Sequence, residues 1–426
     1  MIRFLDRAAL LATLALPAFL LYGRALAEAM IGVVDLCFLL ALLADRQPLR
    51  LRPWLVLGLA WWGWEVVCSL PVPALGLGPG GAASMRQALA LGRFIVFAAA
   101  LEQRVLVAAP ARRAMQWVVS ASALFIAGAA WEQLLTGRNF LGAPRWPDGA
   151  LTGPFVKPRA GAPFVRLLFP AVLPAAAALM ERRRLAARAG GVALVLLAVV
   201  TVVLIGQRMP ALLTALGLLV GAALLPRLRR VAAAALLAAS LALAATPVVS
   251  PPTFAKLVGR FTEQMAHFAA SSYGQLYTRA AVITLAHRLH GLGFDGFRDF
   301  CADPAYFHGL PALGLADATA GGAEVCNLHP HNYYLQAATD GGLPGLVLFA
   351  ALAAAWLARL GRGLGGDARG TGLLLAALVH LWPFASTGGL ANLPDDGWFF
   401  LLLGWGLAEA SLRRRRAQPS PPVPCP

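Results

Sequence analysis

Residues 329–345 read HPHNYYLQAATDGGLPG and join the longest polar segment of the chain to a strongly apolar one. Two of the seven histidines, His329 and His331, stand two positions apart where a membrane helix is expected to begin. Imidazole is the side chain that exchanges a proton most readily near neutral pH. A polar loop that delivers such a group to a bilayer surface suggests chemistry on a substrate carried by a lipid.

The composition around this stretch is that of a membrane protein. Of the 426 residues, 59% are hydrophobic and only 13% are charged, and the mean hydropathy is +0.68. A soluble protein carries about twice that charged fraction. Apolar runs of about 20 residues recur, and this length crosses a hydrocarbon core roughly 30 Å thick. The sequence therefore predicts an all-α polytopic membrane protein.

The apolar pattern predicts about twelve transmembrane helices, with one large helical periplasmic loop between spans 9 and 10. The expected spans are residues 8–22, 27–44, 53–70, 87–102, 114–134, 163–180, 190–206, 209–225, 231–247, 333–357, 371–388 and 397–412. Clusters of arginine fall in every second connection, at Arg3, Arg7, Arg46, Arg50, Arg52, Arg104, Arg112, Arg113, Arg182–Arg184, Arg188, Arg227, Arg229, Arg230, Arg359, Arg362, Arg369 and Arg413–Arg416. The positive-inside rule makes this side cytoplasmic and places both termini there.

This topology divides the chain into four parts. They are residues 1–247, with nine spans and a short periplasmic loop at 135–162; residues 248–332, the large periplasmic loop; residues 333–412, with the last three spans; and residues 413–426, a basic cytoplasmic tail. Within the large loop, we expect short amphipathic helices at 253–270 and 273–289, a glycine-rich turn at 291–297, and irregular chain up to His329. An irregular segment of this length indicates a functional loop.

The net charge of +16 does not indicate nucleic-acid binding, because the arginines lie in short clusters between apolar runs. No basic stripe with interleaved aromatic residues is present.

Five cysteines occur in the chain. Cys37 and Cys68 lie in expected spans and are predicted to be core residues. Cys301 and Cys326 lie 25 positions apart in the large loop. An oxidising periplasm favours a disulfide between them, and two buried thiols are the alternative. No Cys/His spacing resembles a zinc site.

Two arginines on the predicted periplasmic side are candidates for binding an anion. Arg208 interrupts two apolar spans, and burying an arginine at a bilayer centre costs about 2.5–3.5 kcal/mol, so it either lines a cavity or reaches outward to water. Arg279 lies on the second predicted loop helix, where a lone arginine is more often a solvated charge. Arginine is also the residue best suited to bidentate contact with phosphate oxygens.

Two further groups have a structural alternative beside the chemical one. A lone histidine at a membrane interface usually anchors a helix, whereas the pair His329 and His331 followed by Asn332 favours a functional site, with Asn332 capping or orienting the helix. Asp395 and Asp396 are either part of a turn or a paired-carboxylate acid and base.

Four stretches together carry a likeness to a known family. They are LTGPFVKPRAGAPFVRLLFP (151–170), GQRMPALLTALGLLVG (206–221), TRAAVITLAHRLHGLGFDGF (278–297) and HPHNYYLQAATDGGLPG (329–345). In this order they resemble the O-antigen ligase and O-antigen polymerase superfamily of bacterial membrane glycosyltransferases. The last stretch, similar to the family's His-Asn-x-x-Leu signature, is the most specific. One departure is Pro158-Arg159, where many members have Pro-Asn.

The resemblance implies transfer of a glycan from undecaprenyl diphosphate to an acceptor hydroxyl at the periplasmic face of the bacterial inner membrane, without a metal or other cofactor. Arginines would stabilise the charge that develops on the departing diphosphate, and a base would take the hydroxyl proton. The expected catalytic residues are His331, Arg279 and Arg208. The expected substrate-binding residues are His329, Asn332, Arg159 and Arg145.

Three functions fit these motifs. A ligase would use lipid A–core as acceptor, and a polymerase of O-antigen or exopolysaccharide would use another lipid-linked glycan with the same donor. We favour the ligase because of the twelve-span layout and the single dominant late loop. A transporter or flippase of a polyprenyl-linked lipid would instead require polar residues near the middle of several spans, whereas the polar residues here concentrate at one face.

Overall fold

The structure, a computed structural model, describes residues 1–45, 49–317 and 320–417. Within these ranges all named elements are helices or helical turns. The helices are α1 (Ile2–Tyr22), α2 (Arg24–Asp45), α3 (Pro53–Cys68), α4 (Gly81–Ala100), α5 (Ala109–Thr136), α6 (Gly161–Met180), α7 (Leu185–Ile205), α8 (Arg208–Leu224), α9 (Arg229–Val249), α10 (Pro251–Phe254), α11 (Arg260–Ala266), α12 (Ser272–Ala286), α13 (Gly296–Phe300), α14 (Tyr333–Gly361), α15 (Ala368–His380) and α16 (Asp395–Ala417). The predicted basic tail lies outside the described residues from position 418 onward.

Eight helices in the described ranges are long and apolar enough to cross a membrane, by length and composition. They are α1, α2, α4, α5, α6, α7, α9 and α14, where α4 is extended by a π turn. Each of the other four expected spans also overlaps a helix, but α3, α8 and α15 have only 16, 17 and 13 residues. The last of the four, α16, ends in a run of arginines. An all-helical membrane protein is therefore confirmed, and the count of twelve spans is not.

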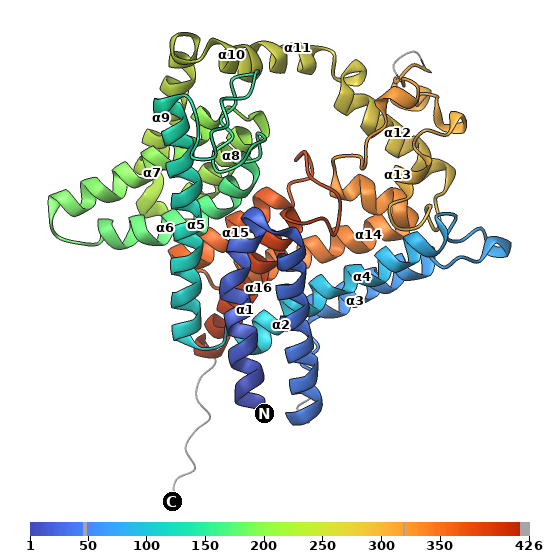
Figure 1. Ribbon diagram of the computed structural model, residues 1–426, viewed down its shortest axis with the longest axis horizontal. Helices are drawn as coiled ribbons and strands as arrows, with labels where there is room; N and C mark the ends of the chain where they lie inside the picture. The colour runs from blue at the N-terminus through green and yellow to red at the C-terminus, as the bar shows by residue number, and fades with distance from the viewer. Residues whose placement is uncertain (46–48, 318–319, 418–426) are drawn as a thin grey trace, which may run out of the picture.

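The apolar helices share one hydrophobic core. In Figure 1, α1 and α2 run beside each other, and α3 and α4 extend away from them at a large angle. Helix α14 packs on α3, α15 on α6 and α8, and α16 on α4. The contact between α15 and α6 is close, because a Cβ at Gly372 would lie 2.7 Å from the carbonyl oxygen of Phe169. Small residues of this kind let two membrane helices approach each other. The packing brings the ends of α6, α8, α14, α15 and α16 into one region.

A break in α14 anchors the long loop, defined here as residues 250–332. Gly342 has φ 66° inside the helix, so the preceding carbonyl groups are free to accept other donors. The glycine-rich turn inserts there: Leu292 N donates to Thr339 O and Gly293 N to Asp340 O, each at 2.9 Å. Leu343 N in turn donates to the carbonyl of Arg288 at 2.8 Å. The loop is therefore fixed to the helix that begins just after His331.

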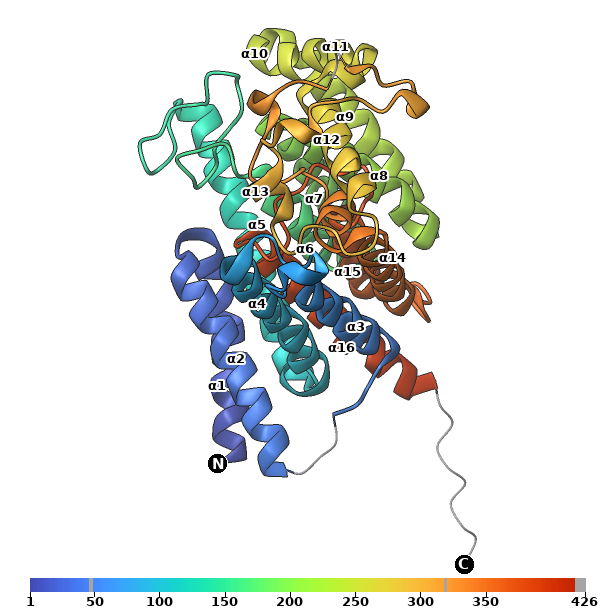
Figure 2. The ribbon, with the colours of Figure 1, turned by 90° about the vertical axis from the view of Figure 1, so that its right-hand side faces the viewer.

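The long loop forms a unit with its own small core. Helices α10 and α11 lie at the end of the molecule away from the N-terminus (Figures 1 and 2). The predicted helix at 253–270 is split into α10, a π turn, α11 and a 3₁₀ turn, with the poor helix former Gly259 where the π turn meets α11. The second predicted helix is α12. Its buried face packs against side chains that include Leu292, Phe297 and Tyr306.

Candidate functional site

Both ring nitrogens of His331 have a hydrogen-bond partner. Its Nδ1 lies 2.9 Å from the carbonyl oxygen of Thr387, and the Thr387 N–H donates to the carbonyl oxygen of His331 at 2.9 Å. A carbonyl only accepts, so Nδ1 carries the hydrogen and the neutral ring holds its lone pair on Nε2. The backbone of His331 has φ 54°, which is uncommon for a residue other than glycine. The backbone of Thr387 thus fixes both the backbone conformation of His331 and the tautomer of its ring.

Thr387 belongs to a loop where the sequence predicted a helix. The expected span 371–388 was wrong after residue 380, because α15 ends at His380 and the following segment contains Pro383 and Gly388-Gly389. This connection, residues 381–394, folds back onto the start of α14. Leu390 N donates to Gln336 Oε1 at 2.9 Å. It is the element that sequence reasoning missed, although its proline and glycines are turn signals.

Asn332 begins α14. Its side-chain oxygen accepts hydrogen bonds from the N–H groups of Tyr334 and Leu335, at 3.0 and 3.1 Å, and its amide nitrogen donates to the carbonyl of Pro383 at 2.6 Å. The residue is buried. An N-cap of this kind satisfies helix donors that would otherwise lack a partner. The geometry therefore fits a structural role better than the expected contact with substrate.

His329 lies directly beside His331, with ring centroids 4.4 Å apart. Burial, followed by electrostatic interaction with His331 and Arg298, lowers the pKa of His329 to about 4. Its imidazole is therefore neutral near pH 7. Its Nε2 atom is buried and has no hydrogen-bond partner among the described residues. This environment favours a neutral neighbour of His331 over a second base.

Arg208 stands at the first residue of α8, where the helix dipole also favours an anion. The residue is half-buried, and its guanidinium donates to Gln264 of α11. The neighbouring Gln207 donates to the carbonyl of Pro158. This contact brings the segment before α6, with the exposed Arg159, against the start of α8. Two of the expected anion-binding residues therefore come from adjoining segments.

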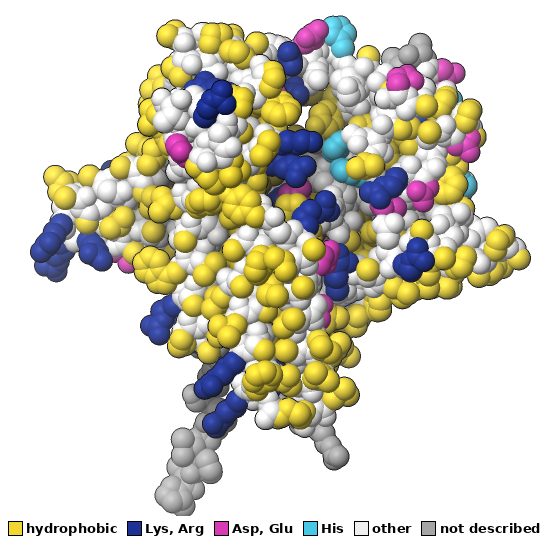
Figure 3. Space-filling model, viewed as in Figure 1, with side chains coloured by type: hydrophobic (Ala, Val, Ile, Leu, Met, Phe, Trp, Pro, Cys, Tyr) yellow, Lys and Arg dark blue, Asp and Glu magenta, His cyan; other side chains and the backbone are white. Residues whose placement is uncertain are grey.

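A cavity of about 40 Å³ lies between the starts of α6 and α8 and the connection 381–394. Its lining includes Arg166, Met209, Ser386 and Thr387. Met209 follows Arg208 and Thr387 holds His331, so the cavity lies between the segments that carry these two groups. In Figure 3, Lys and Arg side chains gather with histidine in a hollow near the centre of the face.

Arg166 is a charged group that the sequence analysis did not single out. It lies on α6 with only 7% of its surface exposed, and its Nη1 is 2.5 Å from Asp395 Oδ1. Asp396 instead accepts from the hydroxyl of Tyr333 at 2.8 Å and from the N–H of Asn392 at 3.1 Å. The two carboxylates thus have separate partners and are not placed as one acid–base pair. The sequence signal that could have identified Arg166 is its charge inside the apolar run 163–180.

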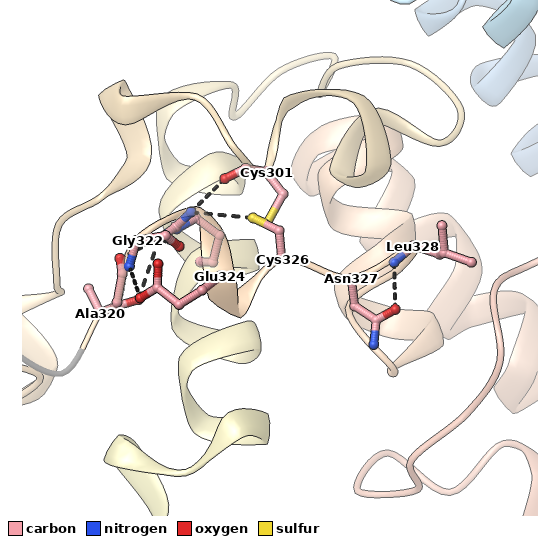
Figure 4. Close-up of a disulfide and its surroundings, with 9 residues drawn as sticks. Cys301, Ala320, Gly322, Glu324, Cys326, Asn327 and Leu328 are labelled. Carbon is pink, nitrogen blue, oxygen red and sulfur yellow. Dashed lines mark hydrogen bonds between the residues drawn. A yellow bond between two sulfur atoms is a disulfide. The ribbon is translucent and has the colours of Figure 1, made fainter.

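Arg279 is fully buried in the long loop, away from any open surface. Its Nη1 donates to the carbonyl of Cys301 at 2.5 Å, and its Nη2 to those of Gly321 and Gly322 at 2.7 and 3.2 Å. Cys301 and Cys326 form a disulfide beside it, with the sulfur atoms 2.08 Å apart (Figure 4). Both terminal nitrogens of Arg279 therefore donate to the backbone of its own loop, and this geometry favours a structural role.

The remaining expected residue, Arg145, is half-buried in the segment before α6, and its Nη2 lies 3.4 Å from the carbonyl of Leu134. Within the described ranges, no three His, Cys, Asp or Glu side chains are grouped so as to hold a metal ion.

Comparison with known proteins supports one family. Residues 192–350 match the family model described as O-Antigen ligase. The matched segment runs from α7 to the first half of α14 and contains Arg208, Arg279, His329 and His331. It confirms the resemblance to the O-antigen ligase and polymerase superfamily. No curated protein matches the chain significantly.

Proposed function

Because residues 192–350 match the O-antigen ligase family, we propose that the protein is a glycosyltransferase that moves a glycan from undecaprenyl diphosphate to lipid A–core at the periplasmic face of the inner membrane. The observation that carries the proposal is the imidazole of His331, whose Nδ1–H is held by Thr387 O so that the lone pair lies on Nε2. Glycan transfer to a hydroxyl needs a group that accepts the hydroxyl proton, and Nε2 of a neutral imidazole can accept it.

The acceptor oxygen attacks the anomeric carbon of the donor and forms the new glycosidic bond. The bond between that carbon and the phosphate oxygen breaks, and its electron pair leaves with the diphosphate. The hydroxyl proton passes to Nε2 of His331. General-base catalysis of this kind typically contributes about 10²–10⁴-fold.

The departing diphosphate gains negative charge, and for its stabilisation we propose Arg208, with Arg159 as a second contact. Both come from adjoining segments at the start of α8, where the helix dipole adds to their charge. Arg166 lines the cavity but is paired with Asp395. Arg208 is therefore the arginine that we assign to the diphosphate.

Arg279 is assigned to the loop instead of the diphosphate. Its bonds to the carbonyls of Cys301, Gly321 and Gly322 hold the chain that leads through Cys326 to His331. Arg279 therefore influences the reaction indirectly, by holding in position the segment that leads to His331.

The test is transfer of a lipid-linked glycan to lipid A–core with purified protein in a bilayer, with and without chelator. We expect transfer in both conditions, and its loss in the variant His331→Ala while donor binding persists. Absence of transfer by the wild-type chain would refute the proposal, and loss with chelator would refute a mechanism based on this histidine alone.

Deletion of the gene in the native cell distinguishes transfer to lipid A–core from transfer to another lipid-linked glycan. Loss of a ligase leaves bare core and accumulates lipid-linked polymer, whereas loss of a polymerase leaves core that carries a single repeat.

A further inference from the structure

The lone pair of His331 is occupied in this structure. The side-chain nitrogen of Asn327 lies 3.0 Å from Nε2 of His331. The other end of the same amide is fixed, because Asn327 Oδ1 accepts from the N–H of Leu328 at 2.7 Å. With the oxygen used in this way, the amide nitrogen faces the imidazole and donates to it. The atom that must receive the acceptor proton is therefore already hydrogen-bonded.

We propose that Asn327 is a positioning residue that takes the place of the acceptor hydroxyl in the resting enzyme and is displaced by it when the acceptor binds. The inference rests on the proposed role of His331 as the base. An amide N–H and a glycan O–H present the same donor to Nε2, and the single lone pair there accepts only one of them. Asn327 therefore competes with the acceptor and not with the lipid-linked donor.

The other sides of the imidazole are covered. The ring of Tyr273 on α12 packs against it edge-on at 5.7 Å, and that of His329 does so at 4.4 Å. The Nδ1 edge faces Thr387. Asn327 and Leu328 are both exposed, so the Nε2 edge is the one that opens towards solvent. The acceptor hydroxyl must therefore approach Nε2 from the side on which the Asn327 amide lies.

The backbone before Asn327 is held by a covalent bond, whereas its exposed side chain is held by the two hydrogen bonds of its amide. Cys326 directly precedes it and is bonded to Cys301, whose carbonyl accepts from Arg279 (Figure 4). Displacement thus needs a rotation of one exposed side chain and no movement of the loop. After release of the product the same side chain can return to Nε2.

The experiment compares Asn327→Ala with Leu328→Ala, a matched control because only the backbone of Leu328 contacts the amide. Initial rates are measured against lipid A–core and against the lipid-linked donor. Asn327→Ala should lower the KM for the acceptor about two- to tenfold, the range expected for one net hydrogen bond. The KM for the donor and the rates of Leu328→Ala should stay unchanged. Asn327→Ser, whose side chain is too short to reach Nε2, should behave like Asn327→Ala.

A second measurement does not depend on transfer. Diethyl pyrocarbonate acylates a free imidazole lone pair, and peptide mass spectrometry reports its reaction with His331. Asn327→Ala should accelerate this modification several-fold relative to the wild type and to Leu328→Ala. A lower kcat with unchanged acceptor KM and unchanged modification would overturn the inference. If the wild type transfers no glycan but the modification rate still responds to Asn327→Ala, the proposed function fails while the contact itself is upheld.

Discussion

Replacing Arg279 by lysine distinguishes a structural arginine from one that binds phosphate. Lysine keeps the charge but presents it on a single nitrogen, whereas Arg279 uses two nitrogens for carbonyl groups on different segments. One nitrogen reaches Cys301, and the other reaches Gly321 and Gly322. The guanidinium also lies over the ring of Phe307, 4.4 Å from its centroid. Lysine cannot satisfy both segments at once.

The expected cost follows from these contacts. A hydrogen bond from a charged donor contributes about 1.5–3 kcal/mol, and Arg279→Lys loses one or two of them, or about 1.5–6 kcal/mol in local stability. Because the side chain is 0% exposed, solvent does not replace the lost partners in the folded loop. The loss should be confined to residues 301–327, since the membrane helices have a separate core.

Hydrogen exchange with mass spectrometry measures this directly. We expect faster exchange in residues 301–327 of Arg279→Lys, unchanged exchange in the second half of α14, and donor binding within about twofold of wild type. Arg288→Lys is the matched control, because Arg288 lies just beyond the end of the same helix with an exposed side chain. Wild-type exchange together with lost donor binding would show that Arg279 contacts the diphosphate and would refute the structural assignment.

Three further predictions concern the site and the topology. His331→Ala should reduce transfer by at least about 100-fold, the lower end of general-base catalysis, with donor binding intact; a near-normal rate would place the base elsewhere. Arg208→Lys should retain only part of the activity, because lysine lacks the planar fork that grips two phosphate oxygens; full activity would argue against this clamp. In a background without other free thiols, a cysteine at the exposed Ala312 should react with a reagent applied from outside the cell, whereas one at Arg184 should be protected; the opposite pattern would invert the topology.

The helices could be predicted from the sequence because a bilayer requires a certain length and hydropathy of each membrane helix independently. Every expected span overlaps a helix, and α14 begins at Tyr333, the first residue of the expected span. The motif around His331 was likewise visible, since its residues are neighbours in the chain. Where the sequence analysis failed, as at residues 381–388, apolar composition outweighed the local signals of Pro383 and the glycines.

What the tertiary structure alone decided is which polar groups face one another. Arg166 and Asp395 are far apart in sequence and meet only because α6 and α16 begin in the same region. Arg279 looked like a ligand for phosphate, yet the folded loop surrounds it with its own carbonyl groups. The tautomer of His331 depends on a backbone carbonyl of Thr387, and a backbone group leaves no trace in residue identity. Composition and periodicity predict which segments form membrane helices. The partners of a buried polar group depend instead on contacts between segments, and these contacts exist only in the packed fold.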